Sequence, residues 1–183
     1  LKVMAYEEAT YNIVYQNNIY EIRDYNERLA VQVNHNDQNR SFQRLFKYIS
    51  GSNIDSKKIN MTTPVTESKK ISMTTPVIQS NENNIKIMQF FLPSKFTINN
   101  APKPSDKDIK LVLVEQGYYA VIKYSGRHTD KNFNKYSKIL KDRLSIDNIE
   151  ILSLAIKATY NSPFTLPFLR RNEAMYHIVW NDK

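Results

Sequence analysis

Few side chains in this sequence suit nucleophilic or metal chemistry. The chain has no cysteine, which excludes disulfides, thiolate metal sites and cysteine nucleophiles. Serines, histidines and carboxylates are present, but no G-x-S-x-G, H-E-x-x-H or paired-carboxylate motif joins them. The three histidines, His35, His128 and His177, lie far apart in the sequence, and a lone histidine is more often a surface or hydrogen-bonded residue than a ligand.

A short internal repeat could provide a binding surface for an apolar ligand. Residues 58–65 (KINMTTPV) recur with one change as residues 70–77 (KISMTTPV), 12 positions later. The two copies can form a hairpin that turns at residues 66–69 and places Met61, Met73, Thr63 and Thr75 on one surface. Two interpretations stay open: the methionines fill the core, or they form a flexible wall against a flat apolar ligand.

The first half of the chain has a strand, helix, strand pattern that would position the repeat. Alternating apolar and polar residues predict antiparallel strands at residues 11–15, 19–25 and 29–33. From Ser41 the spacing is helical, with Phe42, Leu45, Phe46 and Ile49 on one stripe, and Gly51 can end this helix. Further strands are predicted at residues 58–65, 70–78 and 85–92.

The second half repeats this order after a proline-containing connection at residues 93–104. Strands are predicted at residues 109–115 and 118–124, then a helix at 130–144 capped by Thr129 or Asp130, then strands at 150–160 and 174–180. The fold class predicted is therefore α+β. We expect one domain, residues 1–183, with two similar halves (11–93 and 105–181) joined in one distorted antiparallel sheet or barrel and two helices packed outside.

The charge balance limits the partners. A formal net charge of +8, from 26 Lys and Arg against 18 Asp and Glu, would attract nucleic acid, anionic lipid or small anions. The basic residues are scattered or paired and form no arm of five or more, which argues against specific nucleic-acid binding. No apolar run approaches the roughly 20 residues of a transmembrane helix. The chain begins at Leu1, so both a cytoplasmic location and export after loss of an N-terminal signal stay open.

Five ordered motifs resemble the SOUL family of haem-binding proteins, from about Tyr11 to Trp180. Residues 20–25 (YEIRDY) are similar to the early E-I-R-x-Y strand, and the doubled K-I-x-M-T-x-P-V stretch is similar to a hallmark of the bacterial branch. Mid-chain, FFLP at 90–93 and PKPSD at 102–106 match, as does SGR at 125–127. Near the end, YNSPF at 160–164 and RRNE at 170–173 match the closing signature.

This resemblance implies a barrel of two similar halves that binds haem or a related tetrapyrrole in an apolar crevice, without established catalytic machinery. The porphyrin would lie against the first helix and the nearby sheet. Basic residues there could pair with its propionates through charge-assisted hydrogen bonds, although each could equally belong to a solvated face. With Met73 of the repeat and His177 of the last strand, the candidate contacts are Arg44, Leu45, Phe46, Ile49, Lys57, Lys58, Met61, Val65, Met73 and His177.

The resemblance gives no clear axial ligand for the iron. Some members have a histidine at x of E-I-R-x-Y, whereas this sequence has Asp24, and a carboxylate is a poor substitute. The three histidines, a tyrosine or a methionine could serve, but no spacing singles one out. Burying about 400 Å² of apolar area gives on the order of 10 kcal/mol before association costs, so haem could bind without a strong iron–protein bond.

We therefore predict non-catalytic haem or tetrapyrrole binding for buffering, trafficking or sensing. One alternative is a haem-modifying or iron-releasing enzyme. Another is a small-molecule-responsive module that interacts with an unidentified protein, because the family fold resembles effector-binding domains of bacterial regulators. No helix-turn-helix that would read DNA is visible in the sequence.

Overall fold

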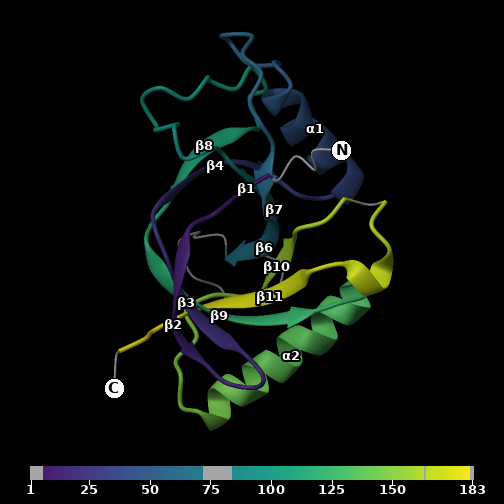
Figure 1. Cartoon of the computed structure of the whole chain (residues 1–183). Helices are drawn as coiled ribbons and strands as arrows, with labels where there is room; N and C mark the ends of the chain where they lie inside the picture. The colour runs from purple at the N-terminus through teal and green to yellow at the C-terminus, as the bar shows by residue number, and fades with distance from the viewer. Residues whose placement is uncertain (1–5, 72–83, 163, 182–183) are drawn as a thin grey trace.

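The computed structural model describes residues 6–71, 84–162 and 164–181. Its main feature is a strongly curled nine-stranded antiparallel sheet with two α-helices outside it (Figure 1). In sheet order the strands are β2 (Tyr11–Gln16), β3 (Glu21–Tyr25), β9 (Gly117–Tyr124), β11 (Asn172–Ile178), β10 (Ile156–Thr159), β6 (Val65–Ile71), β7 (Asn84–Phe91), β4 (Arg28–Asn34) and β8 (Lys110–Val114). The short strands β1 (Glu7–Glu8) and β5 (Thr62–Thr63) pair separately in parallel. The predicted α+β class is confirmed.

The order of the strands is symmetric about the β6–β10 junction. On one side β4 is followed in the chain by helix α1 (Gln38–Ile49) and then by β6 and β7; on the other, β9 is followed by α2 (Asp130–Ile146) and then by β10 and β11. The outer strands are exchanged, because β3 pairs with β9 of the second half and β8 pairs with β4 of the first. The two halves therefore interlock within one sheet.

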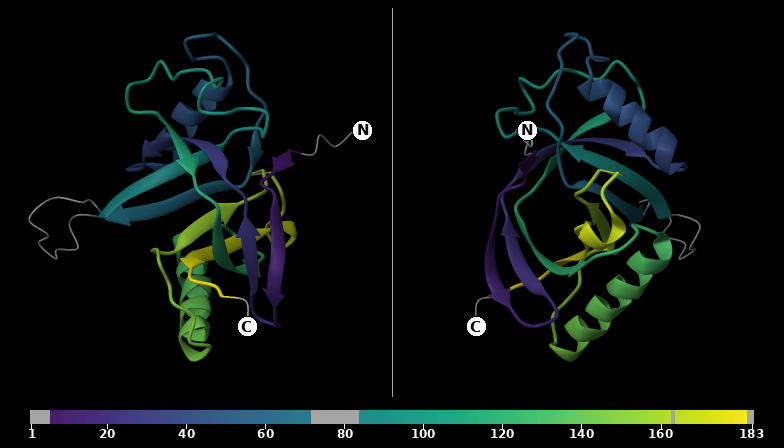
Figure 2. Two further views of the ribbon diagram at one scale, coloured as in Figure 1. Left: turned by 90° about the vertical axis from the view of Figure 1, so that its left-hand side faces the viewer. Right: turned by 45° about the vertical axis from the view of Figure 1, so that its right-hand side comes forward.

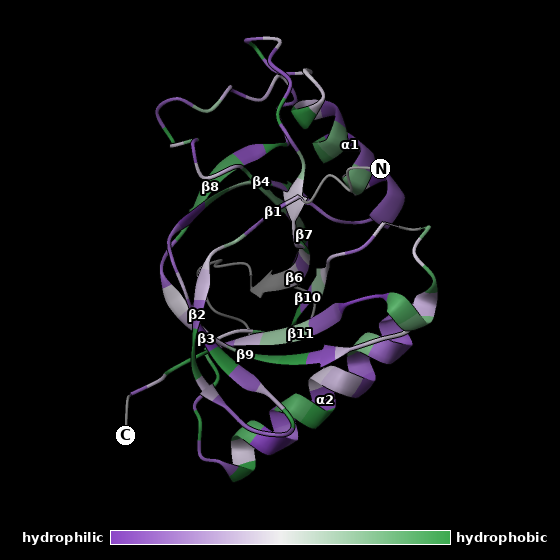
Figure 3. Cartoon of the chain, viewed as in Figure 1, coloured by the Kyte–Doolittle hydropathy of each residue, from purple (hydrophilic) through white to green (hydrophobic). Residues whose placement is uncertain are grey.

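Both helices cover the same outer face of the sheet (Figure 2). Leu45, Tyr48 and Ile49 of α1 pack on β4 and β7, and Leu140 and Leu144 of α2 pack on β9 and β11. The opposite, concave face carries a third cluster around Tyr25, Tyr119, Val121 and Met175. Apolar and polar residues are interspersed along both helices, as in an amphipathic helix that packs one face on a sheet (Figure 3).

Local signals explain the helix ends. Asp37 caps α1 by accepting a hydrogen bond from the Arg40 backbone N–H at 2.7 Å, and Gly51 follows the helix with a φ of 115° that favours glycine. The predicted cap of α2 is confirmed, since the Thr129 hydroxyl accepts from the Asn132 N–H at 3.3 Å. No helix among the described residues is long and apolar enough to span a bilayer.

The predicted hairpin turning at residues 66–69 is wrong. These residues lie inside β6, which pairs with β7 from Val65↔Phe90 to Ile71↔Asn84. Their polarity suggested a turn, but Glu67 has partners in the structure: it lies 3.1 Å from Lys157 Nζ and 3.2 Å from His35 Nε2. The second copy of the repeat, with Met73 and Thr75, falls outside the described residues except for its first two positions.

Candidate functional site

Four of the residues predicted from the sequence to contact haem meet beneath α1. Leu45 and Ile49 are buried, and Met61 and Val65 pack against the same cluster of apolar side chains. The predicted proximity is therefore present. These residues form the core under the helix, however, and Leu45 has no exposed surface that a ligand could contact.

The remaining candidates on this side are exposed or already partnered. Phe46 is 48% exposed and stacks on Phe42 with ring centroids 6.1 Å apart. Arg44 Nε donates to Asp106 at 2.8 Å and its Nη2 donates to Asp108 at 2.7 Å. These hydrogen bonds raise the pKa of Arg44, and the two carboxylates balance its positive charge. Lys57 and Lys58 are exposed. Met73 lies outside the described residues.

His177 does not join this group. It lies on β11 in the other half, where its ring stacks on Tyr119 with centroids 5.0 Å apart, and burial lowers its pKa. As predicted, it shares the strand face of Met175, while Tyr176 and Ile178 face α2. A Cβ added at Gly117 would lie 2.8 Å from His177 Nε2, which is too close. Glycine at this position therefore leaves room for the imidazole.

The concave interior between the two halves does not provide the predicted apolar crevice. The cavity lined from both halves by Tyr25, Gln89, Tyr119 and Met175 has a volume of about 40 Å³. Ligand pockets usually enclose about 300–1,000 Å³, so this space is far too small for a porphyrin. Polar and aromatic side chains of the described residues occupy most of the interior.

A buried ionic network fills one end of this interior, and residues from two of the sequence motifs build it. Arg23 has no exposed surface; its guanidinium donates to both Glu173 oxygens at 2.7 and 2.9 Å and to Glu21 at 2.6 Å. Tyr160 donates to Glu173 at 2.6 Å. Burial and the Glu173 charge raise the pKa of Tyr160, which keeps its hydroxyl protonated. The network links β3 to β11, and its charged groups are already paired with one another.

A larger hollow lies where the N-terminal ends of both helices approach one another, and we call it the helix-end hollow. Its volume is about 490 Å³. Gln38 opens α1 on one side, Thr129 and Asp130 open α2 on the other, and the 3-10 turn η2 (Pro167–Leu169) contributes Pro167. The seven lining residues are Gln38, Arg127, His128, Thr129, Asp130, Pro167 and Arg170.

The charges of the helix-end hollow favour anionic groups. Arg127 is exposed, and Arg170 borders the hollow while its Nε donates to the Thr165 carbonyl at 2.8 Å. Asp130 is offset by Lys157, whose Nζ lies 3.1 Å from it; this interaction lowers the pKa of Asp130. The first backbone N–H groups of both helices add positive partial charge at the same place.

His128 supplies a neutral imidazole to the helix-end hollow. Its Nδ1 lies 2.9 Å from Arg170 Nη1, and because a guanidinium only donates, Nδ1 accepts and the ring proton resides on Nε2. Burial, followed by the charges of Arg170 and Lys157, lowers the pKa of His128. The ring is therefore uncharged at neutral pH, but the nitrogen that faces away from Arg170 carries a proton.

Apolar side chains are exposed along residues 164–169, and from this segment Pro167 lines the helix-end hollow. In residues 164–169 Phe164 is 96% exposed, Phe168 70%, Leu169 63% and Leu166 56%. Single exposed apolar residues are ordinary, whereas four within six positions are unusual on a protein surface. This segment supplies exposed apolar surface directly before Arg170 in the chain.

The contact residues chosen from the sequence include none of the seven that line the helix-end hollow, although two of the matched motifs contain lining residues. SGR at 125–127 supplies Arg127, and the closing signature (YNSPF at 160–164 with RRNE at 170–173) supplies Arg170. The hollow depends on how the two helices approach across the β6–β10 junction, and neither helix reveals this by itself.

The geometry describes an α+β domain with a two-half curled sheet and a cationic hollow at its helix ends. The sequence matches the family model described as SOUL heme-binding protein over residues 6–177, and the chain belongs to this family. No curated protein matches the sequence.

Solved structures share the fold at low identity. An uncharacterised conserved protein from Listeria innocua superposes with a TM-score of 0.63 at 9% identity, covering 89% of this chain and 93% of that one. A structure titled as a hydrolase from the same organism gives 0.58 at 11%, covering 91% and 94%. The C-terminal domain of EcmrR gives 0.60 at 10%, covering 91% and 99%. At these identities the likeness shows the fold alone.

Proposed function

We propose that this chain binds haem or a related tetrapyrrole without transforming it, and that the ligand occupies the helix-end hollow. The observation that carries the proposal is the hollow itself, with a volume of about 490 Å³ and a lining that includes Arg127, Arg170 and Pro167 of the exposed apolar segment 164–169. This volume lies within the usual range for ligand pockets. Membership of a haem-binding family supports the choice of ligand.

The two ends of a haem molecule need different surroundings, and the hollow offers both. Arg127 and Arg170 would pair with the propionates, since charge-assisted bonds to a guanidinium are stronger than neutral ones. Phe164 and Phe168 would cover the apolar macrocycle; their exposed area is large enough for burial to stabilise the complex. The role would be buffering, trafficking or sensing.

The state of His128 supports binding without a strong bond to iron. Its Nδ1 is engaged by Arg170 and its Nε2 carries the ring proton, so ligation would first require loss of the arginine contact. Apolar contact and propionate pairing would then supply most of the affinity. Bound haem would supply the iron chemistry, whereas the residues described here hold and orient the ligand.

Substitution of Arg127 tests the site. Arg127→Glu should weaken hemin binding about tenfold or more, because an attractive charge near a propionate becomes repulsive. Absorbance titration in the Soret region measures the dissociation constant. Lys141→Glu, with the same change of charge on an exposed position of α2 eleven residues beyond Asp130, is the matched control and should change affinity little.

Two aspartate substitutions separate this site from the one expected on α1. Phe168→Asp should weaken hemin binding, whereas Phe46→Asp should not, if the helix-end hollow holds the porphyrin. The reverse result would place haem on the exposed face of α1. If Phe168→Asp, Phe46→Asp and Arg127→Glu all bind hemin with the wild-type dissociation constant, the proposed site is contradicted.

The enzyme alternative has a separate readout. Two Listeria innocua structures with this fold are titled hydrolases, but low identity carries the fold and not the reaction. Among the described residues no group of three or more His, Asp or Glu side chains is placed to hold a metal ion. After incubation with excess haem and a reductant, the total porphyrin and its bound iron should stay constant once the haem iron is reduced; steady loss of either at substoichiometric protein would show catalysis.

A further inference from the structure

Arg28, at the start of β4, is a cation without a carboxylate partner. No carboxylate oxygen of the described residues lies within 4.0 Å of its guanidinium, and its buried Nε has no hydrogen-bond partner. The guanidinium instead lies over aromatic rings, 4.4 Å from the Tyr25 centroid, 4.6 Å from Phe91 and 5.7 Å from Tyr119. Arg23, on the preceding strand β3, is by contrast paired with two carboxylates, those of Glu21 and Glu173.

In the absence of a ligand, burial of the Arg28 charge without a carboxylate partner destabilises the charged guanidinium. Burial lowers the pKa of Arg28, and the groups that oppose this effect, among them the hydroxyl of Tyr119, are neutral. Contacts between a cation and aromatic rings are stabilising, but they leave the charge without a counter-ion. A carboxylate that reached the guanidinium would form a bidentate pair in a poorly solvated place, where such a pair is strong.

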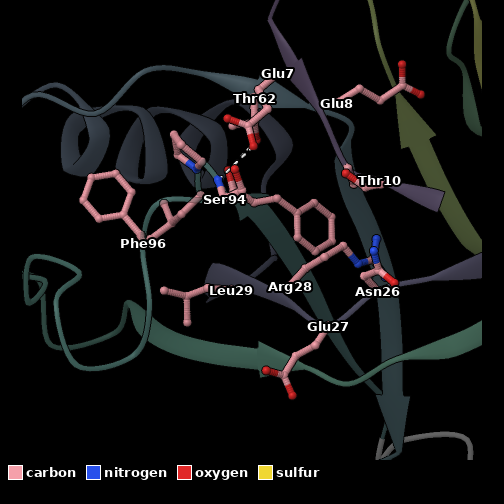
Figure 4. Close-up of a pocket in the computed structure, with 14 residues that line it drawn as sticks. Glu7, Glu8, Thr10, Asn26, Glu27, Arg28, Leu29, Thr62, Ser94 and Phe96 are labelled. Carbon is pink, nitrogen blue, oxygen red and sulfur yellow. Dashed lines mark hydrogen bonds between the residues drawn. The ribbon is translucent and has the colours of Figure 1, made fainter.

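Arg28 borders a hollow that opens to the surface, and we call it the Arg28 pocket (Figure 4). Its volume is about 200 Å³, which suits a small molecule and excludes a porphyrin. Leu29, Phe91 and Phe96 provide apolar walls, and Thr10 and Asn26 provide polar groups. In Figure 4 the Arg28 side chain extends along the pocket toward Asn26.

The other charges of the Arg28 pocket limit the charge of its ligand. Glu8 is paired with Arg171 at 2.9 Å, and Glu7 accepts from the Ser94 N–H at 2.8 Å. Glu27 is exposed at the rim. These carboxylates are held away from Arg28 and would repel a second negative charge on a ligand. A single carboxylate fits this arrangement, whereas a phosphate dianion does not.

We propose that the Arg28 pocket binds a small apolar monocarboxylate, with its carboxylate on Arg28 and its apolar body against Phe91 and Phe96. This site is separate from the helix-end hollow, with which it shares no lining residue. The inference does not rest on haem binding. It assigns to the family fold a second ligand of a different chemical class.

Benzoate is the probe, and the readout is the NMR signal of the Arg28 side-chain N–H together with calorimetric titration. Benzoate should bind saturably in the millimolar range or tighter and shift that signal. Benzylamine, which reverses the charge, and inorganic phosphate, which doubles it, should bind at least tenfold more weakly. Absence of a benzoate-dependent shift in the wild-type protein, or equally tight binding of phosphate, would overturn the proposal.

Two substitutions separate recognition from structure. Arg28→Met should abolish benzoate binding while leaving the melting temperature equal or higher, because it removes an unpaired charge and keeps the apolar stem. Arg28→Lys keeps the charge but loses the planar fork, and should weaken benzoate at least tenfold. Unchanged binding in Arg28→Met would contradict the site. If that variant does not fold, the wild-type shift and Arg28→Lys still decide.

Saturation with hemin separates this site from the proposed haem site. Benzoate affinity should stay the same when the helix-end hollow is filled, and Arg127→Glu should weaken hemin without changing benzoate. Competition between the two ligands would place haem propionates on Arg28 and would overturn the separate assignment. Failure of either proposal is therefore visible without failure of the other.

Discussion

Single residues show most clearly how this fold treats buried charge. Glu173 has no exposed surface and lies between Arg23, Arg171 and the Tyr160 hydroxyl. Burial alone would raise the pKa of Glu173, but the hydrogen bonds and charge of Arg23 outweigh it and lower the pKa below the ordinary 4.5. The carboxylate is therefore held ionised in the interior.

Glu173→Gln should destabilise the protein by about 2–4 kcal/mol, because it leaves the buried Arg23 with a weakened partner. Urea unfolding measures this change. Glu8→Gln removes a carboxylate from the more exposed pair with Arg171 and should cost less than about 1 kcal/mol. Equal losses in the two variants would show that burial does not set the contribution of this network.

The stability difference between the wild-type protein and Glu173→Gln should depend on pH. A carboxyl whose pKa is lowered by folding stabilises the folded state at pH values above its unfolded pKa, near 4.5, and this contribution is lost as the pH falls through the folded value. The wild-type protein should therefore lose its advantage over Glu173→Gln below about pH 4.5. A stability difference that stays constant from pH 7 to pH 3 would contradict ionisation of Glu173.

At the scale of elements, capping decides where the helices begin. The sequence predicted a cap of α2 at Thr129 or Asp130, and Thr129 is the cap observed. It started the first helix at Ser41, however, three residues after its observed start at Gln38. Asp37→Ala should destabilise the protein by about 1 kcal/mol, since the Arg40 N–H loses its acceptor. Asp37→Asn keeps an acceptor and should cost only a fraction of this in thermal unfolding. Equal effects would indicate that charge, not capping, is lost.

The strands also show what periodicity can and cannot predict. Alternation located β2, β4, β7 and β9 to within one or two residues. It failed at β6, where polar Thr66 and Glu67 find partners on β7 and β10 that are distant in the sequence. Motif residues such as Arg127 and Arg170 were visible, but their meeting at the helix-end hollow depends on tertiary structure, as does the isolation of Arg28.

For the whole molecule, exchange of β3 and β8 makes the halves mutually dependent. Ile122→Ala in β9 should lower hydrogen-exchange protection by about 2–4 kcal/mol in β4 of the first half as well as in β11 of the second. Ile146→Ala, at an exposed helix end, is the control and should change neither. Loss of protection confined to the second half would show that the halves unfold independently.

The same strand exchange sets the order of events during protein synthesis. β3 ends at Tyr25, but its partner β9 begins at Gly117, roughly 90 residues later. At about 5–20 residues per second the ribosome needs roughly 5–20 s to supply that partner. During this interval Ile22, which has no exposed surface in the finished fold, lacks its cover, and β3 presents an open edge. This edge of β3 stays unpaired until the second half of the chain emerges.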